Sequence, residues 1–566
     1  MAARLAPRAC WAASSRRLAS LSVTSFSSST DRALTSRGGR ILVLAVLLLL
    51  PAALRAQVAR DSAVDWLVSA GSEGERYLRA LQVAGLANET HWSLRPFSAR
   101  EVGRIARPEA AHPWAERFSA RPSEQVWVRA IQPELGGILN SGFPYGFNDG
   151  PVWAGRGLTA VASAGVQGAV GPLQFVLAPQ FFRAQNVSFP LAPTGRIGPQ
   201  SFGDPQNGSI DLPQRFGDGS YQRLDPGQSV VRVTIARVSA GVSTANETWG
   251  PGVESPFLLS NNAAGFAHLF AGTDGPVRAG SVRLNLRFVA GVLNQSSYSL
   301  ASADSGRRYM TGVAISVGIR QIPGLELGFG RLFANAWPDS GIGVGQILGQ
   351  LFKNPLKSRL VERVGNGGTE ADNQLGSLFA RWVFPRSRVE VYGEVGKEDN
   401  SYDKRDLALE PDHDLAYLLG LQRAWKQASG SLLVLRGEVL NTSISHLDRV
   451  REQAPPYVHT PIVQGHTQIG QVLGAPAGYA GGSTSLALDW FSPRGRASVG
   501  WRRAMRAPPP VSTSAKDVTN SLSVEGITFR RRIDVAPEIT LVWNENRNAA
   551  GDAFNARFGL MGRAHW

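Results

Sequence analysis

The stretch "FNARFGLMGRAHW" (Phe554 to Trp566) alternates between two kinds of side chain. Its even positions are apolar or small, its odd positions are mostly polar, and an aromatic residue ends the chain. A period of two gives a β-strand two different faces. The stretch therefore predicts a strand with one oily and one polar environment, and raises the question of which sheet it completes.

The same alternation recurs upstream, for example in "SVRLNLRFVAGVL" (Ser281–Leu293) and "RVEVYGEVG" (Arg388–Gly396). A soluble antiparallel sandwich also alternates, so the connections between strands carry the stronger signal. Short connections such as "SPRG", "KQASG", "FPRS" and "QIPG" alternate strictly with long ones at 506–520, 442–482, 397–413 and 335–373. Alternate connections of an up-and-down sheet lie at opposite ends, and outer-membrane barrels combine short periplasmic turns with longer external loops.

Seventeen clear strands follow residue 158, and the weaker segment "QVWVRAI" (Gln125–Ile131) makes eighteen. We therefore expect an all-β transmembrane barrel, antiparallel and up-and-down, with about 18 strands over residues 124–566. An even count puts both chain ends on the periplasmic side. The last strand, 554–566, would close the barrel against the first, place Trp566 at the periplasmic interface, and present a recognition signal to the barrel assembly machinery.

The composition agrees with a barrel, and the start of the sequence contains an apolar run typical of an export signal. Charged residues are 18%, mean hydropathy is −0.11, and no later stretch approaches the roughly 20 apolar residues of a spanning helix. Residues 1–56 are expected to be a presequence with a secretory signal peptide, whose apolar run is 41–50 and whose cleavage follows Ala56. Residues 1–36 also resemble an organelle transit peptide, although an over-long translation start fits better.

Removal of the presequence changes the remaining chain. It carries +7 of the net charge of +15, and it contains the only cysteine, Cys10. The mature protein would hold about +8 and no disulfide. Residues 57–123 read as a small periplasmic helical segment, with an amphipathic stretch at 74–86 and capping-box spacing between Ser98 and Glu101.

One segment resembles a known family. "NETWGPGVESPFLLSNNAAGF" (Asn246–Phe266) is similar to the signature segment of the Wzi family of capsule assembly proteins. "FNDGPVWAGRGL" (147–158), "VYGEVGKEDN" (391–400) and "YVHTPIVQGHTQIGQVLG" (457–474) resemble its other strands and its late Gly-rich loop. The resemblance implies an eighteen-stranded outer-membrane barrel with a small periplasmic helical bundle. It also implies lectin-like binding of surface polysaccharide, although loops 187–227 and 335–373 are longer than the family pattern.

Aromatic and amide side chains in the loops are the candidate polysaccharide contacts, because rings stack on sugar faces and amides bind hydroxyls. They are Trp249, Asn261, Asn262, Trp337, Tyr402, Tyr457, His459 and Tyr479. For Trp249 the alternative is that the rigid Gly-Pro-Gly turn after it folds inward and packs the barrel. The same alternative applies to Asn261 and Asn262, and for the remaining residues the alternative is contact with lipid-linked sugars or with nothing.

A second set of charged residues is predicted to face the lumen by strand parity. It comprises Arg283, Arg287, Arg320, Arg331, Glu390, Glu394, Arg436 and Glu438. Because both signs are interleaved, these residues suit a paired ladder that fills the interior. The alternative is a basic pathway for anionic sugars.

The expected protein is thus an outer-membrane, lectin-like barrel of a Gram-negative-type bacterium, exported by the secretory pathway. Its partners would be surface or capsular polysaccharide and outer-membrane lipid, with no nucleic acid. No catalytic motif is present, and the acidic loop 397–413 lacks EF-hand spacing, so we predict no enzyme activity, metal or cofactor. The alternatives are a porin-like channel for small solutes and a structural barrel of envelope biogenesis.

Overall fold

In the computed structural model, every described residue lies within 60–566. The described residues are 67–69, 71–105, 114, 126–302, 306–339, 341–351, 372–398, 404–412, 414–443, 455–506 and 516–564. The expected presequence, Tyr402 and Trp566 lie outside them.

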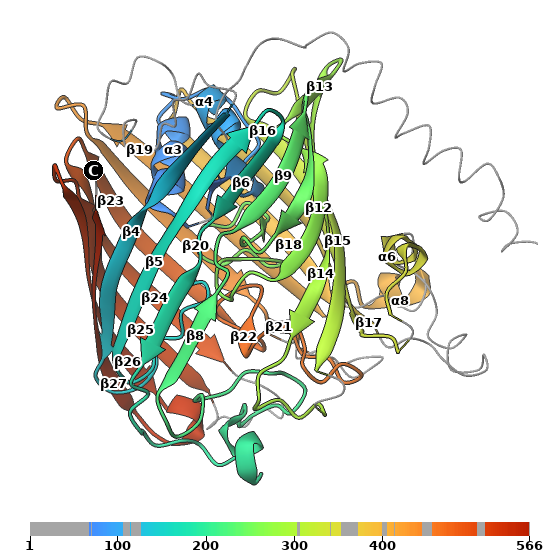
Figure 1. The fold of residues 1–566 in the computed structure, drawn as a ribbon, viewed down its shortest axis with the longest axis vertical. Coiled ribbons are helices and arrows are strands. Elements are labelled where there is room, and N and C mark those ends of the chain that lie inside the picture. The colour runs from blue at the N-terminus through green and yellow to red at the C-terminus, as the bar shows by residue number, and fades with distance from the viewer. Residues whose placement is uncertain are drawn as a thin grey trace, which may run out of the picture. The chain divides into compact units, whose positions relative to one another are not determined.

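The described strands form one closed antiparallel barrel (Figure 1). Twenty-one strand segments make up its wall within the described residues, but β6 with β7, β8 with β9, and β12 with β13 each occupy one wall position. The wall therefore has the eighteen positions that the sequence predicted.

The wall strands differ in length. They are β4 (Val126–Asn140), β5 (Gly157–Val170), β6 (Leu173–Leu177), β7 (Gln180–Ala184), β8 (Tyr221–Asp225), β9 (Val230–Ile235), β10 (Val238–Ser243), β12 (Ala267–Thr273), β13 (Val277–Ala279), β14 (Val282–Asn294), β15 (Arg307–Ile319), β16 (Leu325–Ala336), β17 (Asp372–Phe384), β18 (Val389–Glu398), β19 (Leu415–Lys426), β20 (Leu432–Asn441), β23 (Gly481–Ser492), β24 (Gly495–Arg506), β25 (Asp517–Thr528), β26 (Ile533–Glu545) and β27 (Ala553–Ala564). Most have ten or more residues, enough for a tilted crossing of a bilayer.

The last strand closes the barrel against the first. β27 pairs with β4 in antiparallel register, with Arg557 opposite Asn140 and Phe558 opposite Leu139. Closure pairs the edges that would otherwise remain open in hydrocarbon. This pairing answers the question raised by the C-terminal stretch: its strand completes the sheet.

Strand parity separates an apolar outside from a polar inside. In β27, Phe554, Phe558 and Leu560 are exposed on the outer face, whereas Asn555 and Arg557 are buried in the lumen. The other long strands repeat this arrangement, so the wall carries an apolar belt. Lipid can cover such a belt without leaving polar backbone groups unpaired.

The two ends of the barrel differ. Short turns gather at the end where the C-terminus lies, and the long loops gather at the other end (Figure 1). We refer to them as the periplasmic end and the external end, following the usual arrangement of outer-membrane barrels.

Short helices and hairpins complete the fold. The helices α3 (Glu73–Val83) and α4 (Ala99–Ile105) lie at the periplasmic end, with β1 (Leu67–Val68), β2 (Leu94–Arg95) and β3 (Phe97–Ser98). The hairpin of β21 (Thr467–Gln468) and β22 (Gln471–Val472) lies inside the barrel, whereas α6 (Val344–Leu351) and α8 (Lys404–Leu409) lie outside it (Figure 1). Within the described residues, the helices are all too short or too polar to serve as membrane spans.

Candidate functional site

The lumen is filled by a loop that we call the plug loop, residues 244–266, which includes β11 (Thr248–Trp249). Glu438 on β20 holds this loop at three successive backbone N–H groups. Val253, Glu254 and Ser255 donate to its carboxylate at 2.7, 3.1 and 2.7 Å. The hydroxyl of Tyr392 donates to the same carboxylate at 2.8 Å. One carboxylate in the lumen therefore accepts hydrogen bonds from three successive backbone N–H groups, which would otherwise be buried without partners.

A second anchor lies at the start of the plug loop. The guanidinium of Arg287 on β14 forms an ion pair with the buried carboxylate of Glu247, with Nε 3.0 Å from Oε2. Trp249 donates its indole N–H to the same carboxylate at 3.2 Å. Burial by itself raises the pKa of Glu247, but Arg287 and the neighbouring His268 outweigh it and lower that pKa to about 2. Glu247 is therefore ionised at neutral pH and fixes the indole.

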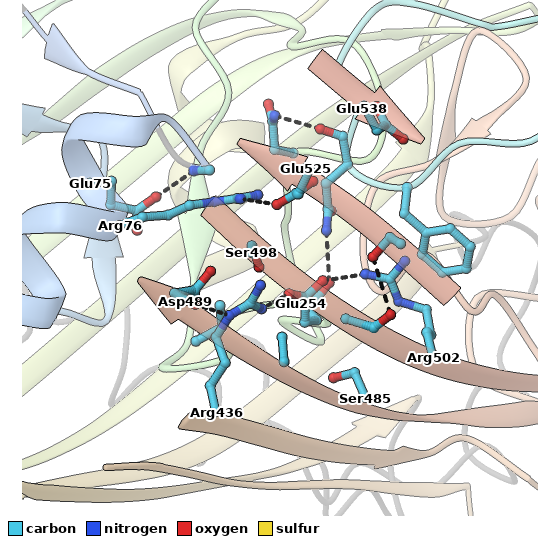
Figure 2. A pocket seen from close by; sticks show the side chains of 18 of the residues that line it. Glu75, Arg76, Glu254, Arg436, Ser485, Asp489, Ser498, Arg502, Glu525 and Glu538 are labelled. Carbon is cyan, nitrogen blue, oxygen red and sulfur yellow. Dashed lines mark hydrogen bonds and ion pairs between the residues drawn. The ribbon is translucent and has the colours of Figure 1, made fainter. Parts of the chain in front are cut away.

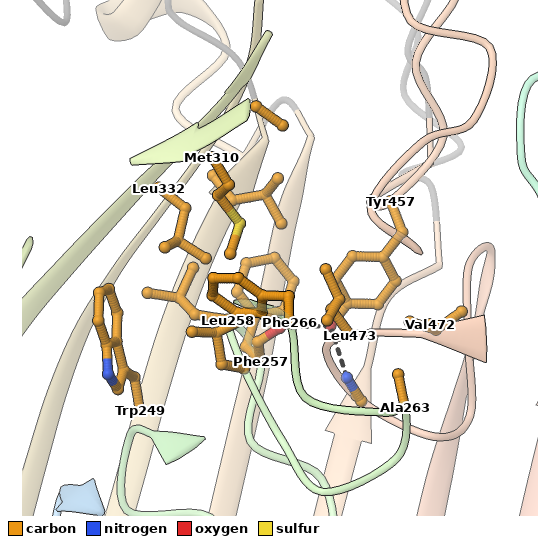
Figure 3. Packing of buried hydrophobic residues seen from close by; sticks show 14 of the residues in the cluster. Trp249, Phe257, Leu258, Ala263, Phe266, Met310, Leu332, Tyr457, Val472 and Leu473 are labelled. Atoms are coloured by element: carbon orange, nitrogen blue, oxygen red, sulfur yellow. Dashed lines mark hydrogen bonds between the residues drawn. The ribbon is translucent and has the colours of Figure 1, made fainter. Parts of the chain in front are cut away.

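Apolar packing surrounds these polar anchors. Trp249, Phe257 and Leu258 of the plug loop are fully buried among side chains of the wall (Figure 3). Glycines on the wall make the room: a Cβ at Gly330 would lie 2.5 Å from Leu258, and one at Gly396 would lie 2.2 Å from Phe257. The absence of side chains at these inward positions lets the plug loop sit against the strands.

A second loop, residues 455–480, enters the lumen from the external end and packs on the plug loop. The Tyr457 hydroxyl donates to the carbonyl of Phe257 at 2.7 Å, and Ser260 N–H donates to Leu473 O at 2.8 Å. His466 Nε2 lies 2.7 Å from the carbonyl of Leu258. Burial lowers the pKa of His466 to about 4, so the imidazole is neutral and Nε2 donates. The two loops form one interdigitated plug.

Helix α3 closes the periplasmic mouth. Arg79 Nε donates to Glu390 Oε1 at 3.0 Å, and Arg381 Nη2 donates to Glu390 Oε2 at the same distance. Arg79 also donates to the carbonyl of Pro251 at 2.7 Å. One buried arginine therefore connects the helix, the wall and the plug loop.

A cavity of about 220 Å³ remains beside α3 (Figure 2). Charged side chains of both signs line it and are paired: Arg76 donates to Glu525 at 2.7 Å, and Arg436 donates to Asp489 at 2.7 Å. Glu254 of the plug loop pairs with Arg436 and with a second wall arginine, Arg502. The interior charges thus act mainly as a paired network that holds the plug.

The structure places the predicted lumen charges as follows. Six point inward, namely Arg283, Arg287, Glu390, Glu394, Arg436 and Glu438. Two predictions are wrong. Arg320 is exposed in the turn after β15, and Arg331 lies on the outer face of β16 with the exposed Leu327 and Phe329. At the inward positions of β16, Gly330 lies beside Leu258 of the plug loop and Gly328 lies beside Phe379 of β17. Packing inside the lumen, which parity cannot reveal, therefore sets the orientation of this strand.

The predicted polysaccharide contacts separate into two groups. Four side chains have almost no exposed surface: Trp249, Tyr457, His459 and Tyr479. In this conformation none of these four rings has a face open to a sugar, and the structure shows them packing inside the barrel. Asn261, Asn262 and Trp337 are half-buried. Asn261 and Asn262 donate to the carbonyls of Asn148 and Val472 at 2.9 Å each.

An aromatic cluster at the external end was missed by the sequence analysis. Phe216 stacks on Tyr221 at 4.4 Å between ring centroids, and its edge meets Tyr298 at 5.7 Å. Phe202 and Trp153 complete the cluster at 5.7 Å from Tyr298 and 5.0 Å from Phe216. All except Phe216 are partly exposed. These rings come from three separate loops and from the first residue of β8, and the local sequence carried no signal that they meet.

A polar surface adjoins the cluster. Arg196 donates to the carbonyl of Asp204 at 3.2 Å and remains half-exposed near Phe202 and Tyr298. We call Arg196, Phe202 and Tyr298 the external tip. It combines ring faces with hydrogen-bond donors, the two kinds of group that carbohydrate recognition requires.

Together, a closed barrel with an apolar belt and a lumen filled by its own loops defines a plugged outer-membrane β-barrel protein. Within this class, the chain belongs to the family described as "Capsule assembly protein Wzi", which it matches over residues 155–554. No curated protein matches the chain.

Several solved structures are similar to the chain. Wzi of Escherichia coli, titled an outer membrane protein involved in group 1 capsule assembly and a carbohydrate-binding β-barrel, is 15% identical with a TM-score of 0.59. That match covers 88% of this chain and 98% of the other. OccK3 (OpdO) of Pseudomonas aeruginosa is 11% identical with a TM-score of 0.36, covering 78% and 96%. OccAB2 of Acinetobacter baumannii is 8% identical with a TM-score of 0.37, covering 76% and 97%.

Proposed function

We propose that this barrel binds surface or capsular polysaccharide at its external end and helps to assemble or anchor that polymer at the cell surface. Membership of the capsule assembly family supports the proposal, as does the carbohydrate binding stated for the Escherichia coli protein. The observation that carries it is the external tip, where half-exposed Phe202 and Tyr298 lie beside Arg196. The proposal involves no covalent chemistry.

The plug argues against the porin alternative. The plug loop, loop 455–480 and α3 occupy successive levels of the lumen and are joined by buried hydrogen bonds. A solute channel would need those contacts to break. A polymer that arrives from outside would instead meet the external loops.

Binding of a repeating polymer does not need a tight single site. When several weak contacts engage one chain, each later contact is intramolecular, and the combined strength can exceed either contact by about 10²–10⁴. A shallow external tip therefore suffices if neighbouring loops hold adjacent sugar units. We include contact of the apolar belt with outer-membrane lipid, and recognition of strand 554–566 by the barrel assembly machinery, as parts of the same proposal.

The test removes the rings of the external tip. The double variant Phe202→Ala/Tyr298→Ala should bind purified surface polysaccharide at least about tenfold more weakly, because truncation of a key aromatic contact typically costs 1–2 kcal/mol or more. Tyr298→Phe, which keeps the ring, is the matched control and should bind like the unmodified protein. Binding is measured with the full-length protein in nanodiscs. Unchanged affinity in the double variant, with the barrel folded, would refute the role of the external tip.

A further inference from the structure

The wall has an incomplete stretch on the external side of β9, β10 and β12. Within the described residues, β8 pairs only with β7, and β10 ends at Ser243, after which the chain turns into the plug loop. β10 has six residues, whereas the neighbouring β14 and β15 have thirteen each. Since a tilted strand needs about 9–11 residues to cross a bilayer, β10 cannot cover the full thickness of the hydrocarbon.

A pocket of about 720 Å³ lies at this incomplete stretch. Its lining runs from Leu177 and Pro179 across the ends of β9, β10 and β12 to Val292 and Thr311. Ile347 of α6 lines it from outside the wall. The volume falls within the range of about 300–1,000 Å³ typical of small-molecule sites, and the lining is predominantly apolar. We call it the lateral pocket.

The lateral pocket faces the membrane at the level where the apolar belt ends. The outward residues of β15 run from Ile319 through Ile315 to Val313, and Thr311, Tyr309 and Arg307 follow toward the external end. An aromatic residue followed by a cation is typical of the lipid–water interface. The lateral pocket therefore opens toward the outer leaflet, near the depth of lipid ester groups.

A hydroxyl that lines the lateral pocket lacks a hydrogen-bond partner within the described residues. Thr311 is fully buried, and its hydroxyl makes no hydrogen bond within the described part of the chain. Other lining hydroxyls are satisfied: Ser243 donates to Ser229 O at 3.2 Å, and Thr244 donates to Gly227 O at 2.9 Å. An unpaired buried hydroxyl is costly, so a ligand that offers an oxygen at this point gains a specific interaction.

We propose that the lateral pocket binds one acyl chain of an outer-leaflet lipid, with an ester or hydroxyl oxygen of that lipid bonded to Thr311. Apolar contact alone would not select such a ligand, because an acyl chain in the bilayer is already surrounded by hydrocarbon. Selectivity comes from the shape of the lateral pocket and from the Thr311 hydroxyl. This site is separate from the external tip and does not depend on polysaccharide binding.

The test uses the full-length protein in vesicles of phosphatidylethanolamine that contain a small fraction of the same lipid with a diazirine in one acyl chain. After illumination, labelled peptides are mapped by mass spectrometry. Label should concentrate on residues 226–244, 267–269, 290–292 and 309–311. Ala290→Phe, which fills the lateral pocket from its floor, should remove most of this label. Ala271→Phe, on the same outer wall but outside the lining, should leave it unchanged.

Thr311→Val tests the polar contact with little change of shape. It should reduce labelling by the ester lipid about fivefold, the usual effect of one neutral hydrogen bond, and should not affect labelling by an ether-linked analogue that lacks the ester carbonyl. Label spread evenly around the barrel, or label that Ala290→Phe leaves intact, would overturn the proposal. The proposal would also be overturned if a photoreactive amino acid placed at position 290 cross-linked to residues 352–371 of the chain and not to lipid.

Discussion

The contact between Glu438 and the plug loop leads to a specific prediction about how firmly the lumen is closed. Each oxygen of the carboxylate accepts two hydrogen bonds: Oε1 from the N–H groups of Glu254 and Ser255, and Oε2 from Val253 N–H and the Tyr392 hydroxyl. Glu438→Gln keeps the size of the side chain but replaces one oxygen by an NH₂ group. That group is a donor and faces two donors.

The cost follows from these contacts. The Tyr392 hydroxyl can rotate and accept from the new NH₂ group, but the Val253 N–H cannot, and a buried donor left unsatisfied costs about 1–3 kcal/mol. The two bonds to the remaining oxygen lose their charge assistance, at about 1 kcal/mol each. The plug should therefore be weakened by about 3–5 kcal/mol, which raises the population of its open state by a factor of about 10² to 4 × 10³.

Planar-bilayer recordings measure this population directly. The unmodified protein should stay closed, and Glu438→Gln should show repeated opening events and a lower urea midpoint of unfolding. Tyr392→Phe is the control, because it removes one charge-assisted bond of about 1.5–3 kcal/mol and leaves all three backbone bonds in place. If Glu438→Gln stays as closed as the unmodified protein and unfolds at the same urea concentration, Glu438 does not hold the plug.

Three further predictions concern the interior and the leader. Because the pKa of His466 is lowered to about 4 in the fold from an unfolded value near 6.5, its stabilising effect should be complete above pH 6.5 and lost as pH falls toward 4. The loss is about 3 kcal/mol, and His466→Gln should flatten that part of the pH–stability profile. Trp249→Ala should cost about 3–5 kcal/mol in urea unfolding, whereas Trp337→Ala, at a half-exposed site, should cost much less. N-terminal sequencing of membrane-extracted protein should begin at Gln57, and a start upstream of the apolar run 41–50 would contradict cleavage of a secretory signal.

The sequence predicted the wall well because a barrel strand is defined by local information. Side-chain parity in residues 554–564 separated the lipid face from the lumen face, and the alternation of short and long connections located the two ends. Counting these strands predicted the eighteen wall positions. A bilayer imposes the same requirement on every strand: its outer face must be apolar, and its backbone must be hydrogen-bonded to a neighbouring strand on each side. Each strand could therefore be recognised from its own sequence.

The contents of the lumen were decided by tertiary structure. Tyr457, His459 and Tyr479 occur in loops where no period indicates a direction, and they pack inward because the plug loop and the wall together leave space for them. Arg331 faces outward because Gly330, at an inward position of β16, makes room for Leu258. The rings of Trp153, Phe216 and Tyr298 meet only when three loops converge. Which face of a strand is apolar can be read from neighbouring residues in the sequence. Packing in the lumen depends on which distant residues fill the same volume, and only the folded chain determines that.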